Sequence, residues 1–340
     1  ANTTGEANVA VGATSLDANT TGTTNVAVGN NTLSSNTTAD GNTAVGHAAL
    51  EANTTGASNT ATGYKSLQAN TTASNNTAYG LFALRVNTTG AENVAVGANA
   101  LDANTEGSSN VAVGQGALDT NTTGARNTSV GHDSLKSNTT GAENVAVGKG
   151  ALNANTTADN NTAVGRSALL VNTTGTENVA VGANALTATV SGGYNVAVGG
   201  SALAANLAAD NTAVGYVALA ANTTGTNNIA VGNNALDSNT TGASNVAVGQ
   251  NSLSANTTAS NNTAVGQSAL GANTTGNDNV AVGNSTLDAC TTGATNTAVG
   301  SNALGAITTG SENVAVGQGA GQSITTASQN TVLGRDCGDA

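Results

Sequence analysis

Hydrophobic and polar residues alternate along this chain in a pattern that returns every 17 residues. Each repeat opens with Asn, continues with Val or Thr, Ala and Val, and then reaches Gly, as in residues 8–12. The pattern occurs 20 times between Asn8 and Asn330, and one step, from Asn195 to Asn211, is 16 residues long. A short fixed period over a whole chain is typical of a solenoid, in which equivalent residues of successive coils stack on one another.

The repeat, numbered from its Asn as position 1, predicts two short strands. Val or Thr at position 2 and Val at position 4 have the period of a strand, so both side chains point the same way. We expect Val9, Val11 and Leu16 (position 9), with their equivalents, to form the inward set. Gly at position 5 turns the chain, Ala-Leu-x-Ala predicts a second strand, and Asn-Thr-Thr-Gly predicts the return corner. Helix is disfavoured, because Gly, Asn, Val and Thr form helices poorly.

Two positions of the repeat vary less than a solvated surface would. Position 1 is Asn in all 20 copies, which predicts a ladder of side-chain amides along the axis, although Asn also tolerates a tight corner. Position 3 is Ala in 18 of 20 copies, the exceptions being Ser129 and Val332. Because position 3 should face away from Val9 and Val11, we expect another layer to cover it. That layer is either the second strand or, as we favour, another chain.

The predicted fold is therefore all-β, a parallel β-solenoid of about 20 coils that forms a single elongated domain over residues 1–340. Composition supports a thin core, because aromatic residues make up 1% of the chain and Pro, Met and Trp do not occur. The net charge of −12 argues against a nucleic-acid partner, since binding phosphates requires clustered Lys and Arg. No apolar run approaches the ~20 residues of a membrane span.

Residues able to carry chemistry are few and scattered. His47 and His132 share position 6 but lie five coils apart, too far to cooperate. Cys290 and Cys337 lie at different positions of coils roughly 14 Å apart, beyond disulfide reach. We expect idle thiols, although Cys337 could bond another chain.

Acidic residues and sequons give no stronger signal. Asp102 and Asp119 recur at position 10 of neighbouring coils, which allows at most one weak cation site. The Asn-Thr-Thr sequons, such as those of Asn19 and Asn36, are explained by repetition alone. No nucleophile, base and orienting group converge. We therefore expect no enzyme, with no catalytic, cofactor-binding or metal-binding residues and no cofactor.

Besides the irregular stretch from Thr187 to Asp210, which contains the shorter repeat, the pattern breaks in two further places. The largest apolar cluster of the chain comprises Tyr79, Leu81, Phe82, Arg85 and Val86, and it is either a contact patch or a region of looser packing. Near the C-terminal end the Asn of position 12 is replaced in three successive repeats, while the Leu of position 9 is lost twice. The replacing residues are Cys290, Ile307 and Ile324, and the lost Leu positions hold Gly321 and Gly338. We expect position 12 to face inward there and to refill the core partly.

The motif Asn-Val-Ala-Val-Gly-x-x-Ala-Leu-x-Ala resembles the head repeats of trimeric autotransporter adhesins. Its longer form, Asn-Thr-Ala-Val-Gly with Asn-Thr-Thr-Gly, is similar to repeats of phage tail fibres and bacterial surface proteins. The resemblance covers essentially the whole chain and implies a left-handed parallel β-roll, often a trimer. It differs in the 17-residue period and in the absence of a stalk, membrane anchor or chaperone domain from these 340 residues.

The function expected from these observations is a non-enzymatic extracellular or cell-surface fibre or adhesin. It would associate with itself as a trimer or head-to-tail filament, because terminal coils expose unpaired strands. A host or cell-surface glycan or protein is a further expected partner. The alternative is an ice-binding solenoid, in which Thr20-Thr21 and Thr37-Thr38 stack into threonine ladders. Glu106, Ser191 and Ala208 interrupt that face.

Overall fold

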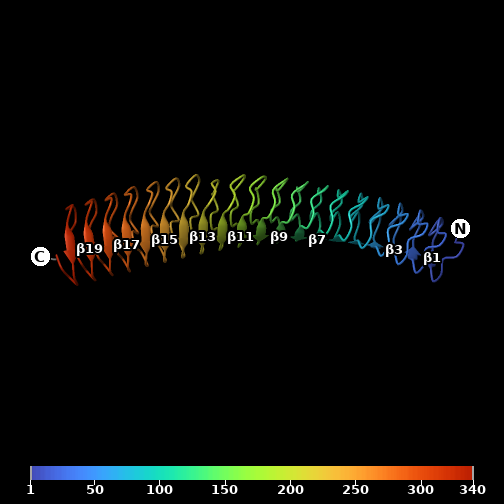
Figure 1. Cartoon of the computed structure of the whole chain (residues 1–340), viewed down its shortest axis with the longest axis horizontal. Helices are drawn as coiled ribbons and strands as arrows, with labels where there is room; N and C mark the ends of the chain where they lie inside the picture. The colour runs from blue at the N-terminus through green and yellow to red at the C-terminus, as the bar shows by residue number, and fades with distance from the viewer. Residues whose placement is uncertain (1, 339–340) are drawn as a thin grey trace. The chain divides into compact units, whose positions relative to one another are not determined.

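The computed structural model describes residues 2–338, and in that range it contains 20 strands of three residues each and no helix (Figure 1). The chain divides into two compact units, one ending at Thr174 and the other beginning at Gly175, and both are built from the same coil. The strands of the first unit are β1 Val9–Val11, β2 Val26–Val28, β3 Thr43–Val45, β4 Thr60–Thr62, β5 Thr77–Tyr79, β6 Val94–Val96, β7 Val111–Val113, β8 Thr128–Val130, β9 Val145–Val147 and β10 Thr162–Val164. Those of the second unit are β11 Val179–Val181, β12 Val196–Val198, β13 Thr212–Val214, β14 Ile229–Val231, β15 Val246–Val248, β16 Thr263–Val265, β17 Val280–Val282, β18 Thr297–Val299, β19 Val314–Val316 and β20 Thr331–Leu333.

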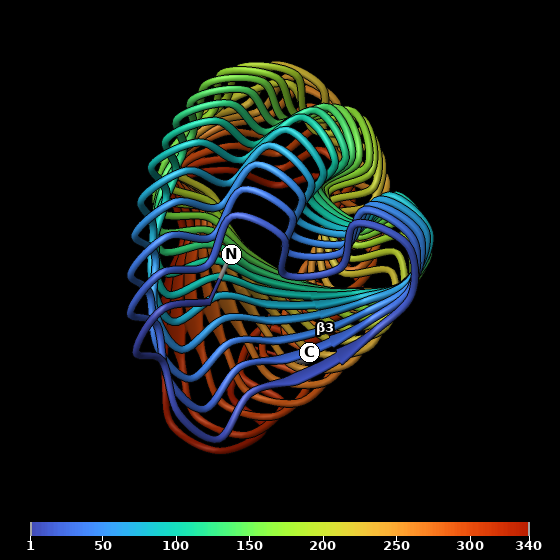
Figure 2. The same cartoon turned by 90° about the vertical axis from the view of Figure 1, so that its right-hand side faces the viewer.

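Within each unit, consecutive strands pair in parallel and in register. Ala10 of β1 lies opposite Ala27 of β2, one repeat of 17 residues further along the chain. The pair Ala197 and Ala213 keeps this alignment across the one repeat that is a residue shorter. Successive coils of the same outline therefore lie over one another (Figure 2). The parallel β-solenoid predicted from the period is confirmed.

The prediction of which strand residues face inward is wrong. Ala at position 3 is fully buried in almost every strand, as at Ala112, whereas the Val residues on either side of it are partly or largely exposed. Val9 and Val11, expected in the core, are 48% and 56% exposed. The interior of the coil is too thin for a second row of branched side chains, so the smallest side chain faces it. The layer that covers the Ala stripe is therefore the inside of the same coil.

The segment Ala-Leu-x-Ala is a stack of turns, and the second strand predicted there is wrong. Its Leu residues are left-handed, with φ of 51° at Leu33, and the residue two before, Asn31, has φ of 56°. Alternating left-handed residues cannot form an extended strand. The backbone still bonds between coils, since the amide of Leu33 donates to the carbonyl of Ala49 at 3.1 Å. Leu at position 9 is buried, as predicted, and Leu16 is 7% exposed.

Two buried asparagine ladders run along each stack. At position 1, the side-chain Nδ2 of Asn25 donates to Oδ1 of Asn8 at 3.2 Å, and the backbone N–H of Asn25 donates to the same oxygen at 2.9 Å, which confirms the predicted ladder. At position 12, Nδ2 of Asn36 donates to Oδ1 of Asn19 at 2.9 Å. Both ladders also close the coil, because Nδ2 of Asn25 and Nδ2 of Asn36 donate to the carbonyl of Ala39 at 2.8 and 3.1 Å. Buried side-chain amides stabilise a fold only when they are hydrogen-bonded. Here the bonds of each amide link two coils and the return corner.

The two exceptions at position 3 are matched by neighbouring changes. Ser129 is fully buried, and its hydroxyl donates to the backbone carbonyl of Ser134, which replaces the usual Ala at position 8, at 2.8 Å. Val332 fills space left by missing Leu side chains, because a Cβ on Gly338 would lie 3.1 Å from its Cγ1. A Cβ on Gly321 would likewise meet Cδ1 of Ile324 at 3.2 Å. The expected partial refilling of the last coils is confirmed.

Candidate binding surfaces

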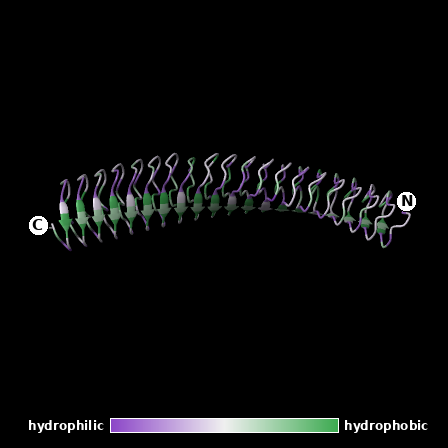
Figure 3. Cartoon of the chain, in the orientation of Figure 1, coloured by the Kyte–Doolittle hydropathy of each residue, from purple (hydrophilic) through white to green (hydrophobic). Residues whose placement is uncertain are grey.

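The outward face of the strands is a regular surface that runs along each unit. Positions 2 and 4 of all 20 repeats carry Val or Thr with only Ile229, Tyr79 and Leu333 as other residues, and none is charged. Typical members such as Val113 and Val282 are 36% exposed. Figure 3 shows the strands as green or pale and the purple, hydrophilic residues mainly in the connecting segments. We call positions 2 and 4 together the sheet face.

The threonines of the return corner stack from coil to coil, but their position-13 hydroxyls are bonded within the stack and do not form an exposed ladder. Thr20 donates its Oγ1 hydrogen to the carbonyl of Thr37 at 2.9 Å, and Thr37 bonds Thr54 in the same way at 3.2 Å. These hydroxyls at position 13 are half-buried and satisfied within the stack. They stabilise the corner, and only the neighbouring position 14, such as Thr21, is exposed.

Aromatic side chains gather on β3 to β5 and the turns that follow these strands. His47 stacks on Tyr64 with ring centroids 5.3 Å apart, and Tyr64 meets Phe82 edge-on at 5.6 Å. The guanidinium of Arg85 lies 4.8 Å from the centre of the Phe82 ring. The cluster expected at Tyr79 to Val86 thus extends over two earlier coils, because His47, Tyr64 and Leu81 share position 6. Its rings contact one another, which favours packing within the chain.

The acidic pair Asp102 and Asp119 lies in a column at position 10 between two basic residues, Arg85 and Lys136. Arg85 holds Asp102 through two contacts, Nε to Oδ1 at 2.9 Å and Nη2 to Oδ2 at 3.2 Å. Burial raises the pKa of Asp119, and the negative charge of Asp102 adds to that effect while Lys136 opposes it. Across residues 2–338, no three His, Cys, Asp or Glu side chains come close enough to hold a metal ion.

The two cysteines occupy opposite environments. Cys290 replaces an asparagine of the position-12 ladder and is fully buried, and burial raises the pKa of its thiol to about 11. Cys337 is exposed. Asn19 and the Asn-Thr-Thr asparagines of the later coils are buried as well, whereas Asn2 is exposed. The side-chain nitrogen of Asn19 donates to Oδ1 of Asn2 and to the carbonyl of Gly22. The folded coil therefore has no room for a glycan on the buried asparagines.

We expect one thiol per folded chain to react with a maleimide at pH 8. The reactive species is the thiolate, and at a pKa of about 11 only roughly one Cys290 in a thousand is ionised at that pH. Mass spectrometry should find a single label on Cys337, and a second label only after denaturation in guanidinium. Labelling of Cys290 at a similar rate in the native protein would contradict the buried placement of position 12.

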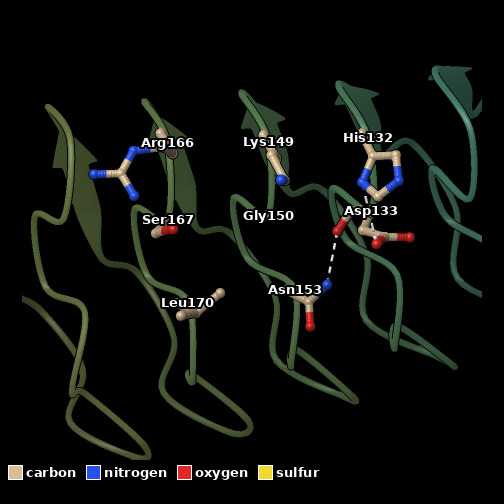
Figure 4. Close-up of a pocket in the computed structure, with 8 residues that line it drawn as sticks. All are labelled: His132, Asp133, Lys149, Gly150, Asn153, Arg166, Ser167 and Leu170. Atoms are coloured by element: carbon tan, nitrogen blue, oxygen red, sulfur yellow. Dashed lines mark hydrogen bonds and ion pairs between the residues drawn. The ribbon is translucent and has the colours of Figure 1, made fainter.

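One hollow is lined by basic side chains. It lies along β8 to β10 in the first unit and has a volume of about 320 Å³. Figure 4 shows His132, Lys149 and Arg166, all at position 6, along one edge, and Asn153 and Leu170 opposite them. Sequence reasoning considered His132 only against His47 and missed this column. The available signal was three consecutive basic residues at position 6 in a chain with seven Lys and Arg.

A second hollow, of about 580 Å³, lies in the other unit between Asp288, Asn302 and Gln322. It contains one carboxylate and otherwise small or neutral polar residues. Burial raises the pKa of Asp288, and no second titratable group lines the hollow to work with it.

No protein-family model matches the chain, and no match was found among curated proteins. In the part of the chain that the structure describes, no helix is long and apolar enough to cross a membrane. The class of protein that the geometry defines is a β-solenoid repeat protein.

Proposed function

We propose that this chain is a non-enzymatic structural module of an extracellular fibre or surface adhesin, whose copies associate through the sheet face. The observation that carries the proposal is the sheet face itself, a continuous strip of Val and Thr without any charge in either unit. Exposed apolar patches of such extent are rare on monomeric proteins and mark interaction surfaces. The Ala stripe no longer supports a second chain, because it is buried inside the coil.

A second copy of the same chain suits this face best. Its side chains form rows at the strand spacing of ~4.8 Å, so two copies have matching ridges and grooves. Charged residues begin at the rim, for example Glu143 and Glu177 at position 17. An apolar centre with a polar rim is the usual anatomy of an interface between protein chains. The resemblance to trimeric adhesin heads supports the same reading, with a trimer or filament as the assembly.

We expect the protein to elute above its chain mass of 32.3 kDa in size exclusion with light scattering. A variant with Val113→Lys and Val164→Lys should shift to that mass, because paired sheet faces would bury its added ammonium groups without partners. The control carries Thr123→Lys and Thr174→Lys, at exposed positions of the same two coils but off the sheet face. A wild type that stays monomeric at every concentration, or a control that dissociates equally, would contradict the proposal.

Ice binding is the second candidate, because the sheet face is regular, charge-free and carries Thr at position 2 of several coils. Thr60 and Thr62 make the one strand with threonine at both outward positions, and Val dominates elsewhere, which favours association with another protein surface. Thermal hysteresis of a monomeric wild type would favour the ice-binding function over the fibre.

A further inference from the structure

The hollow along β8 to β10 owes its basic edge to side chains from three consecutive coils. His132, Lys149 and Arg166 each follow the Gly of position 5, and the parallel stack places them one strand spacing, ~4.8 Å, apart. The whole chain carries a net charge of −12 and seven Lys and Arg residues. A row of this sign is therefore a local reversal of the protein's electrostatic character.

Two of these cations lack a partner. Among residues 2–338, every other Lys or Arg either pairs with a carboxylate or, in the case of Lys65, lies 5.6 Å from the centre of an aromatic ring. Lys149 and Arg166 are exposed and make no salt bridge within that range. The one carboxylate of the hollow, Asp133, already contacts Nδ1 of His132 at 3.1 Å and Nζ of Lys136 at 3.0 Å. The positive charges of Lys149 and Arg166 are therefore available to bind an anionic ligand.

The shape of the hollow results from a glycine. Position 7 carries Asp133 and Ser167 on the two flanking coils but Gly150 between them, so the row of side chains is interrupted there. A Cβ on Gly150 would find its nearest neighbour, Cδ1 of Leu170, 3.5 Å away, so the space is open. Ser167 and Asn153 add a hydroxyl and an amide to the lining (Figure 4). The volume of about 320 Å³ falls in the range of small-ligand sites.

We propose that this hollow binds an acidic oligosaccharide, with carboxylate or sulfate groups of neighbouring sugars on Lys149 and Arg166. Two cations on adjacent coils match oxyanions that are repeated along a chain, and the hydroxyl and amide groups suit sugar hydroxyls. A long polyanion such as nucleic acid fits less well than a short acidic oligosaccharide, because the net charge of −12 would repel the charges that extend beyond the hollow. The proposal rests on the adhesin function proposed above and names the chemical class of its surface ligand.

The repeat supplies substitutions that the fold already accepts. Gln occupies position 6 at Gln115 and Gln250, so Lys149→Gln and Arg166→Gln remove charge without straining the coil. Asn occupies position 7 at Asn99, with φ of 57° against 67° at Gly150, so Gly150→Asn fills the hollow in a tolerated conformation. The matched control is Arg126→Gln, which removes a cation that is paired with Glu143 outside the hollow.

The test is isothermal titration calorimetry of the full chain with uronate, sulfated and neutral tetrasaccharides and with inorganic sulfate. We expect the acidic tetrasaccharides to bind, the Lys149→Gln/Arg166→Gln variant to lose at least tenfold in affinity, Gly150→Asn to lose a similar amount, and Arg126→Gln to stay within twofold. Failure of both acidic tetrasaccharides to bind the wild type, or equal binding to the double variant, would overturn the proposal. Inorganic sulfate binding as tightly as the sulfated tetrasaccharide would reduce the site to a simple anion site and overturn the glycan assignment.

Light scattering on the same variants separates this inference from the proposed function. We expect the Lys149→Gln/Arg166→Gln chain to keep the wild-type mass, since position 6 lies outside the sheet face. A wild type that is monomeric but binds the acidic tetrasaccharides in the hollow would overturn the association through the sheet face and leave the ligand site standing.

Discussion

Replacing Ala112 by Asp should disrupt the solenoid around β7, whereas the same replacement at the adjacent Val113 should leave it folded. Ala112 is completely buried between Ala95 and Ser129 of the neighbouring strands, while Val113 is 36% exposed on the sheet face. A carboxylate at position 112 would be buried without a cation, at a cost of about 3–5 kcal/mol. At position 113 of the single chain the carboxylate reaches water, and the loss in unfolding free energy should be about 1 kcal/mol, the span of strand preferences.

Thermal unfolding by circular dichroism and hydrogen exchange of β6 to β8 would measure this difference. Because each coil of a solenoid contacts only its neighbours, the Ala112→Asp variant should lose protection mainly in these strands. The inward assignment first drawn from hydrophobicity predicts the reverse order of the two variants. If Val113→Asp were the more destabilising variant, the Val side chains would face the core, and the sheet face would not be an exposed surface.

The repeat period was enough to predict the stack, but not which side of the strand faces inward. Hydrophobicity placed Val9 inside, yet position 1 and position 3 lie on the same side of a strand, and the Asn ladder at position 1 is internal. An invariant Asn together with an Ala that is replaced in only two copies thus indicated the correct orientation. The turn formed by residues such as Leu33 could not be predicted, because Leu rarely adopts a positive φ, and here stacking on identical neighbours holds it.

The binding surfaces were predictable only in part. Stacking at a constant period brings Lys149 and Arg166 together, so their column could have been found by aligning the repeats. That Lys149 and Arg166 have no carboxylate partner could not be predicted, because it depends on Asp133 contacting His132 and Lys136 instead. Those contacts involve side-chain orientations that spacing alone does not determine. The pair Asp102 and Asp119 shows the same limit, because Arg85 on the preceding coil takes the first carboxylate.

Replacing Gly114 by Ala should destabilise the protein by roughly 2–5 kcal/mol, combining backbone strain with overpacking. Gly114, at position 5, has φ of 135°, a conformation that side chains of L-residues rarely adopt. A Cβ there would also lie 2.6 Å from the carbonyl oxygen of Gly131 on the next coil. Backbone of a neighbouring coil cannot move aside without breaking the register, so both effects act together.

The matched control lies two residues away, at Gly116. Its φ of 64° is close to that of Asn99 one coil earlier. A Cβ would meet only the carboxylate of Asp133, at 2.7 Å, which can rotate away at the expense of its partly exposed contacts with His132 and Lys136. We expect Gly116→Asn to change stability by less than about 1 kcal/mol, with a gain if the variant restricts the unfolded chain. Chemical denaturation monitored by circular dichroism compares the two directly. If both variants lost the same unfolding free energy, the close approach of Gly114 to the carbonyl of Gly131 would not be the reason that position 5 is glycine.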